Sequence, residues 1–356
     1  GTQTAGSGNI NITSALDWNT SAALTLSAYN SININAPITV SGAGSLILAY
    51  NNNLGGVNTG GSLNFSGGNI RLTGSSGGVA SGVLKVNDAT YTLIQNMSDL
   101  QAVDSSHNYY ALADNLDATG VSGFKTIASS IFFTGTFNGL GNTISNLSVN
   151  GGLFGTNLGV ISDVGLVNMT VSKAGTIGGL KIGGLINSNA GTVSNSFMTG
   201  SITAGSSNDI VGGLIGENTG IVNNVFVSGS IKVGDKIGAI NKTVGGSVGG
   251  LVGSNVGGVI TQAYTTGSVA GANVTASIIQ NNIGIKTANL GVSSTVGGLV
   301  GTNNGTISDS YTTSSVEGGT TSASASTILP DGIGFAGQPV SIIGGQVTAS
   351  NIIGGS

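Results

Sequence analysis

A short pattern occurs five times in this chain and limits the folds that the chain can adopt. Each copy has Gly-Leu, three residues, an asparagine, a glycine at the following turn, and then β-branched residues. The leucines are Leu153, Leu185, Leu214, Leu251 and Leu299, the asparagines Asn157, Asn189, Asn218, Asn255 and Asn303, and the glycines Gly159, Gly191, Gly220, Gly257 and Gly305. Such regular repetition is typical of chains that stack one structural unit on the next.

The copies stay aligned beyond the turn. One position carries an aromatic residue in the last four copies: Phe197, Phe226, Tyr264 and Tyr311. Successive leucines are 32, 29, 37 and 48 residues apart, and the additional residues fall at about 232–246 and 270–295. Because insertions at a fixed place in a repeat emerge on one side of a stack, we expect them to project from one face of the molecule.

Composition points to an all-β chain. Glycine contributes 64 of 356 residues and charged residues only 6%, yet 39% of the residues are hydrophobic, which is too many for a disordered chain. The hydrophobic residues alternate with polar ones in short runs, as at 31–35 and 68–73, and this is the period of a β-strand. Short strands, glycine-rich turns and stacked repeats together predict a parallel β-helix.

Four segments are expected along this β-helix. Residues 1–90 form looser coils, residues 91–150 an aromatic-rich transition segment, residues 151–320 the repeat array, and residues 321–356 degenerate C-terminal coils. A spacing of 22 residues between Leu24 and Leu46 suggests about 22 residues per coil, hence roughly 14 to 16 coils. Residues 97–103 could form one short helix with Ser98 as its N-cap.

Each repeated residue type has an expected structural role. The leucines point into the core, and the asparagines hydrogen-bond to one another from coil to coil as an amide ladder. The aromatic position makes a ladder of offset rings. The glycines supply turns with positive φ. These fifteen residues and four rings are therefore candidate structural residues, with no chemistry of their own.

The array resembles the GLUG repeats of large bacterial surface exoproteins. Residues 109–118 and 133–144 are similar to the segment that precedes such repeats, and residues 20–75 resemble the stalk of filamentous-haemagglutinin-like, high-molecular-weight adhesins of two-partner secretion. The secretion domain of that family is not visible, so export is expected only by association with the family. Because no signal peptide precedes the repeat-like sequence at Gly1, we expect the chain to be a fragment of a longer protein. The resemblance implies a right-handed parallel β-helix, or β-solenoid, that is exported and displayed on the bacterial cell surface.

Charge and composition exclude several kinds of site. With a net charge of −4 and one arginine, the chain has no basic stripe for nucleic acid, and no apolar run is long enough to span a membrane. The absence of cysteine excludes disulfides and thiolate metal sites. The acids are scattered, so we expect no enzyme, no catalytic residue, no cofactor and no metal. A Ca²⁺ site in residues 99–117, which contain His107 and four aspartates, is the alternative to a solvated loop there.

These observations predict an extracellular adhesin segment that acts as a rigid stalk and contact surface. Its expected partner is an unidentified glycan or matrix ligand on a host or neighbouring cell, contacted through the insertions. A self-associating structural fibre, built by end-to-end stacking of unpaired strand edges, is the alternative. A polysaccharide-active β-helix enzyme is the third interpretation, and the scattered acids argue against it.

Overall fold

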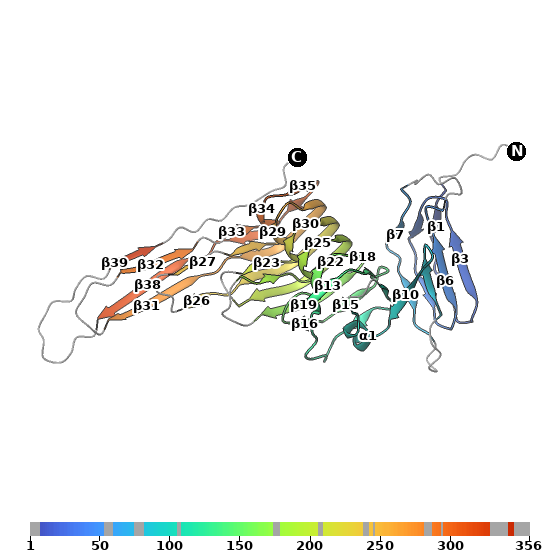
Figure 1. Ribbon diagram of the computed structural model, residues 1–356, viewed down its shortest axis with the longest axis horizontal. Helices are drawn as coiled ribbons and strands as arrows, with labels where there is room; N and C mark the ends of the chain where they lie inside the picture. The colour runs from blue at the N-terminus through green and yellow to red at the C-terminus, as the bar shows by residue number, and fades with distance from the viewer. Residues whose placement is uncertain are drawn as a thin grey trace, which may run out of the picture.

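The N-terminal residues form three coils of a parallel β-helix in the computed structural model (Figure 1). The structure describes residues 8–52, 60–74, 82–104, 108–173, 179–205, 209–237, 242–244, 246–280, 287–292, 295–327 and 341–344. Equivalent strands pair in parallel, so that Ile10 aligns with Ile32 and Leu24 with Leu46. The three sheets contain β1 (Ile10–Ile12), β4 (Ile32–Ile34) and β7 (Leu63–Phe65); β2 (Leu16–Trp18), β5 (Ile38–Val40) and β8 (Ile70–Leu72); and β3 (Ala23–Ser27), β6 (Ser45–Ala49) and β9 (Leu84–Val86).

A transition segment connects these coils to the array. Strand β10 (Ala89–Ile94) pairs antiparallel with β9 and then in parallel with β11 (Tyr109–Leu112), which begins the second stack. The helix α1 (Met97–Gln101) lies between them. The prediction that Ser98 is the N-cap is wrong: Asn96 holds that position, because its side-chain oxygen accepts hydrogen bonds from the backbone N–H groups of Ser98 and Asp99.

The array continues the second stack with one coil per repeat. The sheet that carries the repeated asparagines contains β13 (Ile127–Phe133), β17 (Phe154–Asn157), β21 (Ile186–Asn189), β24 (Ile215–Asn218), β29 (Val252–Asn255) and β34 (Val300–Asn303). A shorter sheet precedes it in each coil and contains β20 (Lys181–Ile182), β23 (Ile210–Gly212), β28 (Ser247–Gly249) and β33 (Thr295–Gly297). Every pairing in these two sheets is parallel.

The third face of each coil is formed by the strands that follow the asparagine turn. In the earlier coils these are β12 (Leu116–Asp117), β14 (Thr136–Asn138), β15 (Thr143–Ser145), β16 (Ser148–Val149), β18 (Val160–Ser162) and β19 (Gly165–Lys173). In the later coils they are β22 (Thr192–Ala204), β25 (Ile221–Val233), β30 (Val259–Ala270), β35 (Thr306–Ser308), β36 (Tyr311–Thr312) and β37 (Ser315–Glu317). Strands β22 and β25 align over twelve residue pairs, which fixes the register of these two coils.

The insertions predicted at 232–246 and 270–295 form an arm on one side of the array (Figure 1), together with two strands from residues 321–356, which were predicted to be degenerate C-terminal coils. The arm consists of two three-stranded parallel sheets. One contains β26 (Lys236–Ile237), β31 (Val274–Gln280) and β38 (Thr321–Thr327), and the other β27 (Lys242–Val244), β32 (Thr287–Val292) and β39 (Ser341–Gly344). The insertions are therefore not simple loops, because their strands stack in the same way as the coils.

The fold class predicted from the sequence, an all-β parallel β-helix with stacked repeats and insertions on one side, is confirmed. The predicted coil length of about 22 residues holds for the first step of the N-terminal coils, from Leu24 to Leu46, and again where β15 and β16 pair with β19, as between Thr143 and Gly165. In the array the aligned asparagines lie 32, 29, 37 and 48 residues apart. The coils are longer because strands such as β22 and β25 have 13 residues each, so the estimate of 14 to 16 coils is too high.

Side chains join the N-terminal coils to the second stack. Asn142 is fully buried, and its Nδ2 donates to the carbonyl oxygens of Ile70 and Leu112 at 2.8 and 3.0 Å. Arg71 makes a bidentate ion pair with Asp114, at 2.6 and 2.9 Å. The backbone N–H of Ile70 also donates to the carbonyl of Leu140. These bonds hold the two stacks together at a junction that no repeat in the sequence indicates.

Candidate functional site

The five repeated asparagines form a continuous line of side-chain hydrogen bonds through the array. From Asn157 to Asn303, each Nδ2 donates to the Oδ1 of the asparagine one coil on, at 2.8, 2.8, 2.9 and 2.7 Å. The other hydrogen of each Nδ2 group is donated to the carbonyl oxygen of a glycine at the same turn. Asn157, Asn189, Asn218 and Asn255 are buried. Because these amides satisfy one another, the ladder stabilises the stack.

The turn glycines are required for a reason other than the predicted one. Gly159, Gly191, Gly220 and Gly305 do not have positive φ. A Cβ atom on Gly191 or Gly220 would instead lie 2.1 Å from the carbonyl oxygen of the turn glycine one coil before. The assignment of Gly257 to this position is also wrong: it has φ +73° and open space around it, and the register places Gly258 at the turn. Close backbone approach between coils therefore excludes any side chain there.

The repeated leucines and the aromatic residues occupy separate columns. Leu153, Leu185, Leu214, Leu251 and Leu299 are fully buried in the core. The four rings stack along the outside of the array, with centroids 4.7, 5.0 and 5.4 Å apart and planes within 8° of parallel, in the order Phe197, Phe226, Tyr264 and Tyr311. Their faces are turned toward one another, so an interior ring in this column has no free face for a ligand.

A second polar column, whose acids were counted among the scattered ones, runs along another corner of the array. Its residues all have positive φ, between 49° and 57°: Asp163, Asn195, Asn224, Gln262 and Asp309. Asn195 donates to Asp163 Oδ1, and Asn224 donates to Asn195 Oδ1, both at 2.9 Å. The recurrence of Asn or Asp at one repeat position in four of the five copies was the signal for this ladder, since both residues tolerate the left-handed conformation.

The carboxylates of residues 99–117 do not converge. Asp99 accepts from the backbone of Gln95, Asp104 from the Tyr110 hydroxyl, Asp114 from Arg71, and Asp117 from Thr119. Hydrogen bonds from Asn146, which contributes most, and from Thr119 lower the pKa of Asp117. His107 lies outside the described residues. Among the residues that are described, no three or more His, Asp or Glu side chains form a group that could hold a metal ion.

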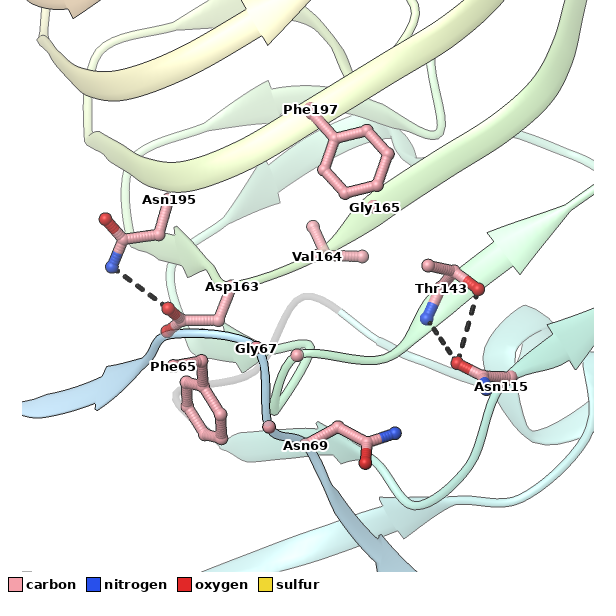
Figure 2. A pocket seen from close by; sticks show the side chains of 12 residues that line it. Phe65, Gly67, Asn69, Asn115, Thr143, Asp163, Val164, Gly165, Asn195 and Phe197 are labelled. Atoms are coloured by element: carbon pink, nitrogen blue, oxygen red, sulfur yellow. Dashed lines mark hydrogen bonds between the residues drawn. The ribbon is translucent and has the colours of Figure 1, made fainter. Parts of the chain in front are cut away.

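The junction of the two stacks contains a cavity of about 530 Å³ (Figure 2). Three parts of the chain form its walls: the last N-terminal coil, the transition segment and the first array coils. Its lining residues are Phe65, Gly67, Gly68, Asn69, Asn115, Gly141, Thr143, Asp163, Val164, Gly165, Asn195 and Phe197. The described lining has two aromatic rings, three amides and one carboxylate, but no Lys, Arg or His.

Asp163 is the titratable group of this cavity. It is 7% exposed. Burial raises the pKa of its carboxyl, and hydrogen bonds with Ser162, Asn195 and Asn138 partly oppose that shift. A buried carboxyl with a perturbed pKa in a cavity is a candidate functional group. Figure 2 shows it beside Asn195, near the edge of the cavity that Phe65 forms.

Glycines make room for both rings of the cavity. The Phe197 ring lies over Gly165, where a Cβ would approach Phe197 Cζ to 2.3 Å. The Phe65 ring lies over Gly141, where a Cβ would be 3.2 Å from Phe65 Cδ1. The site could not be found from the sequence because its residues come from segments that share no repeat.

Comparisons with known proteins give limited similarity. No family model matches the chain. Over 129 residues, 31% of this chain, it is 36% identical to Halomucin of Haloquadratum walsbyi, and that match spans only 1% of Halomucin. The crystal structure of a "putative immunoglobulin A1 protease" from Bacteroides ovatus superimposes with a TM-score of 0.46 and 19% identity, over 67% of this chain and 84% of that one.

One expectation is corrected by these comparisons. The scattered acids led us to expect that the chain is not an enzyme, whereas the structural neighbour is described as a protease. That exclusion is therefore withdrawn. In the described part of the chain, no helix has the length and apolar character needed to cross a membrane.

Proposed function

We propose that this chain is a segment of an extracellular surface adhesin, in which the stacked coils are a rigid scaffold and the arm is the contact surface. The observation that carries the proposal is the arm itself. Its strands come from successive coils and pair with one another, so they extend the stack sideways. An arm anchored in several coils presents one extended surface to a partner cell or matrix, and many weak contacts along it would add by avidity.

Three further features support this proposal. The ladders of amides and rings hold successive coils in register, which suits a stalk. The repeats resemble GLUG repeats of bacterial surface exoproteins, as described from their residues above. The similarity to part of Halomucin is compatible with an extracellular or surface location. The partner is a glycan or protein of a host or neighbouring cell surface.

The test is adhesion of beads coated with the full chain to cultured epithelial cells and to immobilised matrix glycans. In the test variant, short glycine-serine links replace residues 236–244, 274–292 and 321–344. The matched control, Val160→Ser with Ile221→Ser, alters two side chains that are 40% and 50% exposed on a corner of the coils and keeps the arm. Far-UV circular dichroism checks that both variants remain folded.

We expect the full chain and the control to retain beads on the cells, and the arm variant to lose most of that retention. Equal retention by the arm variant would refute the assignment of contact to the arm. No retention by the folded full chain on any of these surfaces would refute the adhesin proposal.

A fibre formed by end-to-end association is the second candidate, and the burial pattern of the first coil favours it. The inward residues Leu24 and Leu26 of β3 are half-exposed, whereas Leu46 and Leu48 of β6, one coil on, are fully buried. Among the described residues, β3 pairs only with β6, and an unpaired strand edge is a template for pairing with a strand of another molecule. Filaments that lengthen with protein concentration in electron micrographs would support the fibre, and a concentration-independent monomer in sedimentation would exclude it.

A further inference from the structure

The aromatic column ends at the junction cavity, and its end differs from its interior. Phe197 stacks on Phe226 through one face. The next positions down the column are Gly165 and then Thr143, which align with Phe197 in the strand register. Since Gly165 has no side chain, the column of rings ends at Phe197, whose ring leans over Gly165 and lines the cavity.

The polar groups of the cavity suit a ligand that both donates and accepts hydrogen bonds. Asn115 Oδ1 accepts from the backbone N–H and the hydroxyl of Thr143, at 2.9 and 3.2 Å. Its Nδ2 has no partner among the described residues. Asn69 donates through Nδ2 to Asn142, and its Oδ1 has no described partner. The cavity therefore offers a free donor, a free acceptor and the Asp163 carboxyl to a hydroxyl-bearing ligand.

The charges of the lining exclude other classes of ligand. An anion would lie beside the Asp163 carboxylate without a Lys, Arg or His in the described lining to balance it. A divalent metal ion usually takes several carboxylate or carbonyl ligands, and the described lining contains one carboxylate, that of Asp163. An entirely apolar ligand would leave the Asn115 and Asn69 amides without partners. A neutral molecule with hydroxyl groups around an apolar face fits these constraints.

We propose that the junction cavity binds a neutral sugar residue. The C–H face of the sugar lies against the part of the Phe197 ring that lines the cavity, and the sugar hydroxyls bond Asn115, Asn69 and Asp163. The cavity volume of about 530 Å³ falls within the usual range of ligand pockets. The site is independent of the arm, so it stands whether or not the arm is an adhesive surface.

Binding at this place would also affect the junction. The lining joins Phe65 and Asn69 of the N-terminal stack to Asn115, Asp163 and Phe197 of the second stack. A sugar that contacts both stacks binds the folded junction and not the unfolded chain, so it stabilises the folded junction.

The test is saturation-transfer NMR followed by calorimetric titration of the full chain. The probes are lactose, cellobiose and N,N′-diacetylchitobiose, with 3′-sialyllactose as a charged comparison. The key variant is Phe197→Ala. Phe226→Ala is its matched control, because it removes a ring of the same column that does not line the cavity. Asn115→Asp is a second variant, which keeps the acceptor for Thr143 and replaces the amide donor.

We expect at least one neutral probe to bind, and to bind more tightly than the charged comparison. Phe197→Ala should weaken its binding about tenfold, through loss of the ring contact, and Phe226→Ala should change it by less than about twofold. Asn115→Asp should weaken it while leaving the circular dichroism spectrum unchanged. The proposal is overturned if no neutral probe binds, if the charged sugar binds best, or if Phe226→Ala weakens binding as much as Phe197→Ala.

Discussion

Removal of one amide from the middle of the asparagine ladder should destabilise the array strongly. Asn218 is fully buried and makes four hydrogen bonds. Its Oδ1 accepts from Asn189 Nδ2 and from the backbone N–H of Gly220, and its Nδ2 donates to Gly220 O and Asn255 Oδ1. Asn218→Ala leaves an Asn189 Nδ2 hydrogen and Asn255 Oδ1 without partners, and both groups are buried.

Each unpaired buried polar group costs about 1–3 kcal/mol, so we expect a loss of about 4 kcal/mol in the free energy of unfolding. Asn303→Ala is the matched control. Asn303 is half-exposed, so water can replace its contacts, and the expected loss is about 1 kcal/mol.

Guanidinium unfolding followed by far-UV circular dichroism measures both variants. Because each coil contacts mainly its neighbours, the midpoint of the array transition is the quantity to compare. If Asn218→Ala destabilises no more than Asn303→Ala, the buried ladder is not a main source of stability and the reasoning is refuted.

Three other substitutions test separate parts of the structure. Gly220→Ala should lower the free energy of unfolding by about 3 kcal/mol in thermal unfolding, since its Cβ would lie 2.1 Å from Gly191 O. Gly257→Ala, in open space at φ +73°, should lower it by only about 1 kcal/mol, and similar losses for the two variants would contradict the close-approach explanation. Asn142→Ala should lower stability by about 3 kcal/mol and separate the fluorescence transition of Trp18, in the N-terminal stack, from the transition seen by circular dichroism; a single shared transition would argue against its bridging role. Burial raises the pKa of Asp163 in the folded state, so between its unfolded and folded pKa values the native state holds the proton more tightly and stability falls as pH rises. Asp163→Asn should therefore be more stable than the parent protein at neutral pH and lose that advantage in acid. If thermal unfolding of the variant has the same pH profile as that of the parent, the assignment is contradicted.

The array could be predicted from the sequence because sequence repetition became spatial repetition. A residue equivalent to Asn157 in the next copy lies one coil away, so the columns of leucine, asparagine and aromatic residues were visible as aligned letters. The role of the turn glycines could not be predicted, because a sequence does not distinguish a positive φ from a close approach of two backbones. The inserted residue at Gly257 was misassigned for a related reason, since two adjacent glycines fit the same pattern.

The junction and its cavity could not be predicted, because no repeat connects their residues. Asn142 bonds carbonyls of two strands that are 72 and 30 residues away in sequence, and nothing in its neighbourhood indicates them. Phe65 and Phe197 reach the same cavity from two different stacks. The ladder from Asp163 to Asn224 could have been found, since Asn or Asp recurs there at one repeat position.

The central claim is that each repeat forms one coil and that successive coils superimpose. Since the chain has no cysteine, nitroxide labels can be attached at Val160→Cys and Thr306→Cys alone. These exposed positions lie in one column, Val160, Thr192, Ile221, Val259 and Thr306, four coil steps from end to end. Pulsed electron paramagnetic resonance should give a narrow distance distribution near 19 Å, allowing for the label arms, because adjacent coils are about 4.8 Å apart. A broad distribution, or a distance well above 30 Å, would contradict the stacked-repeat account.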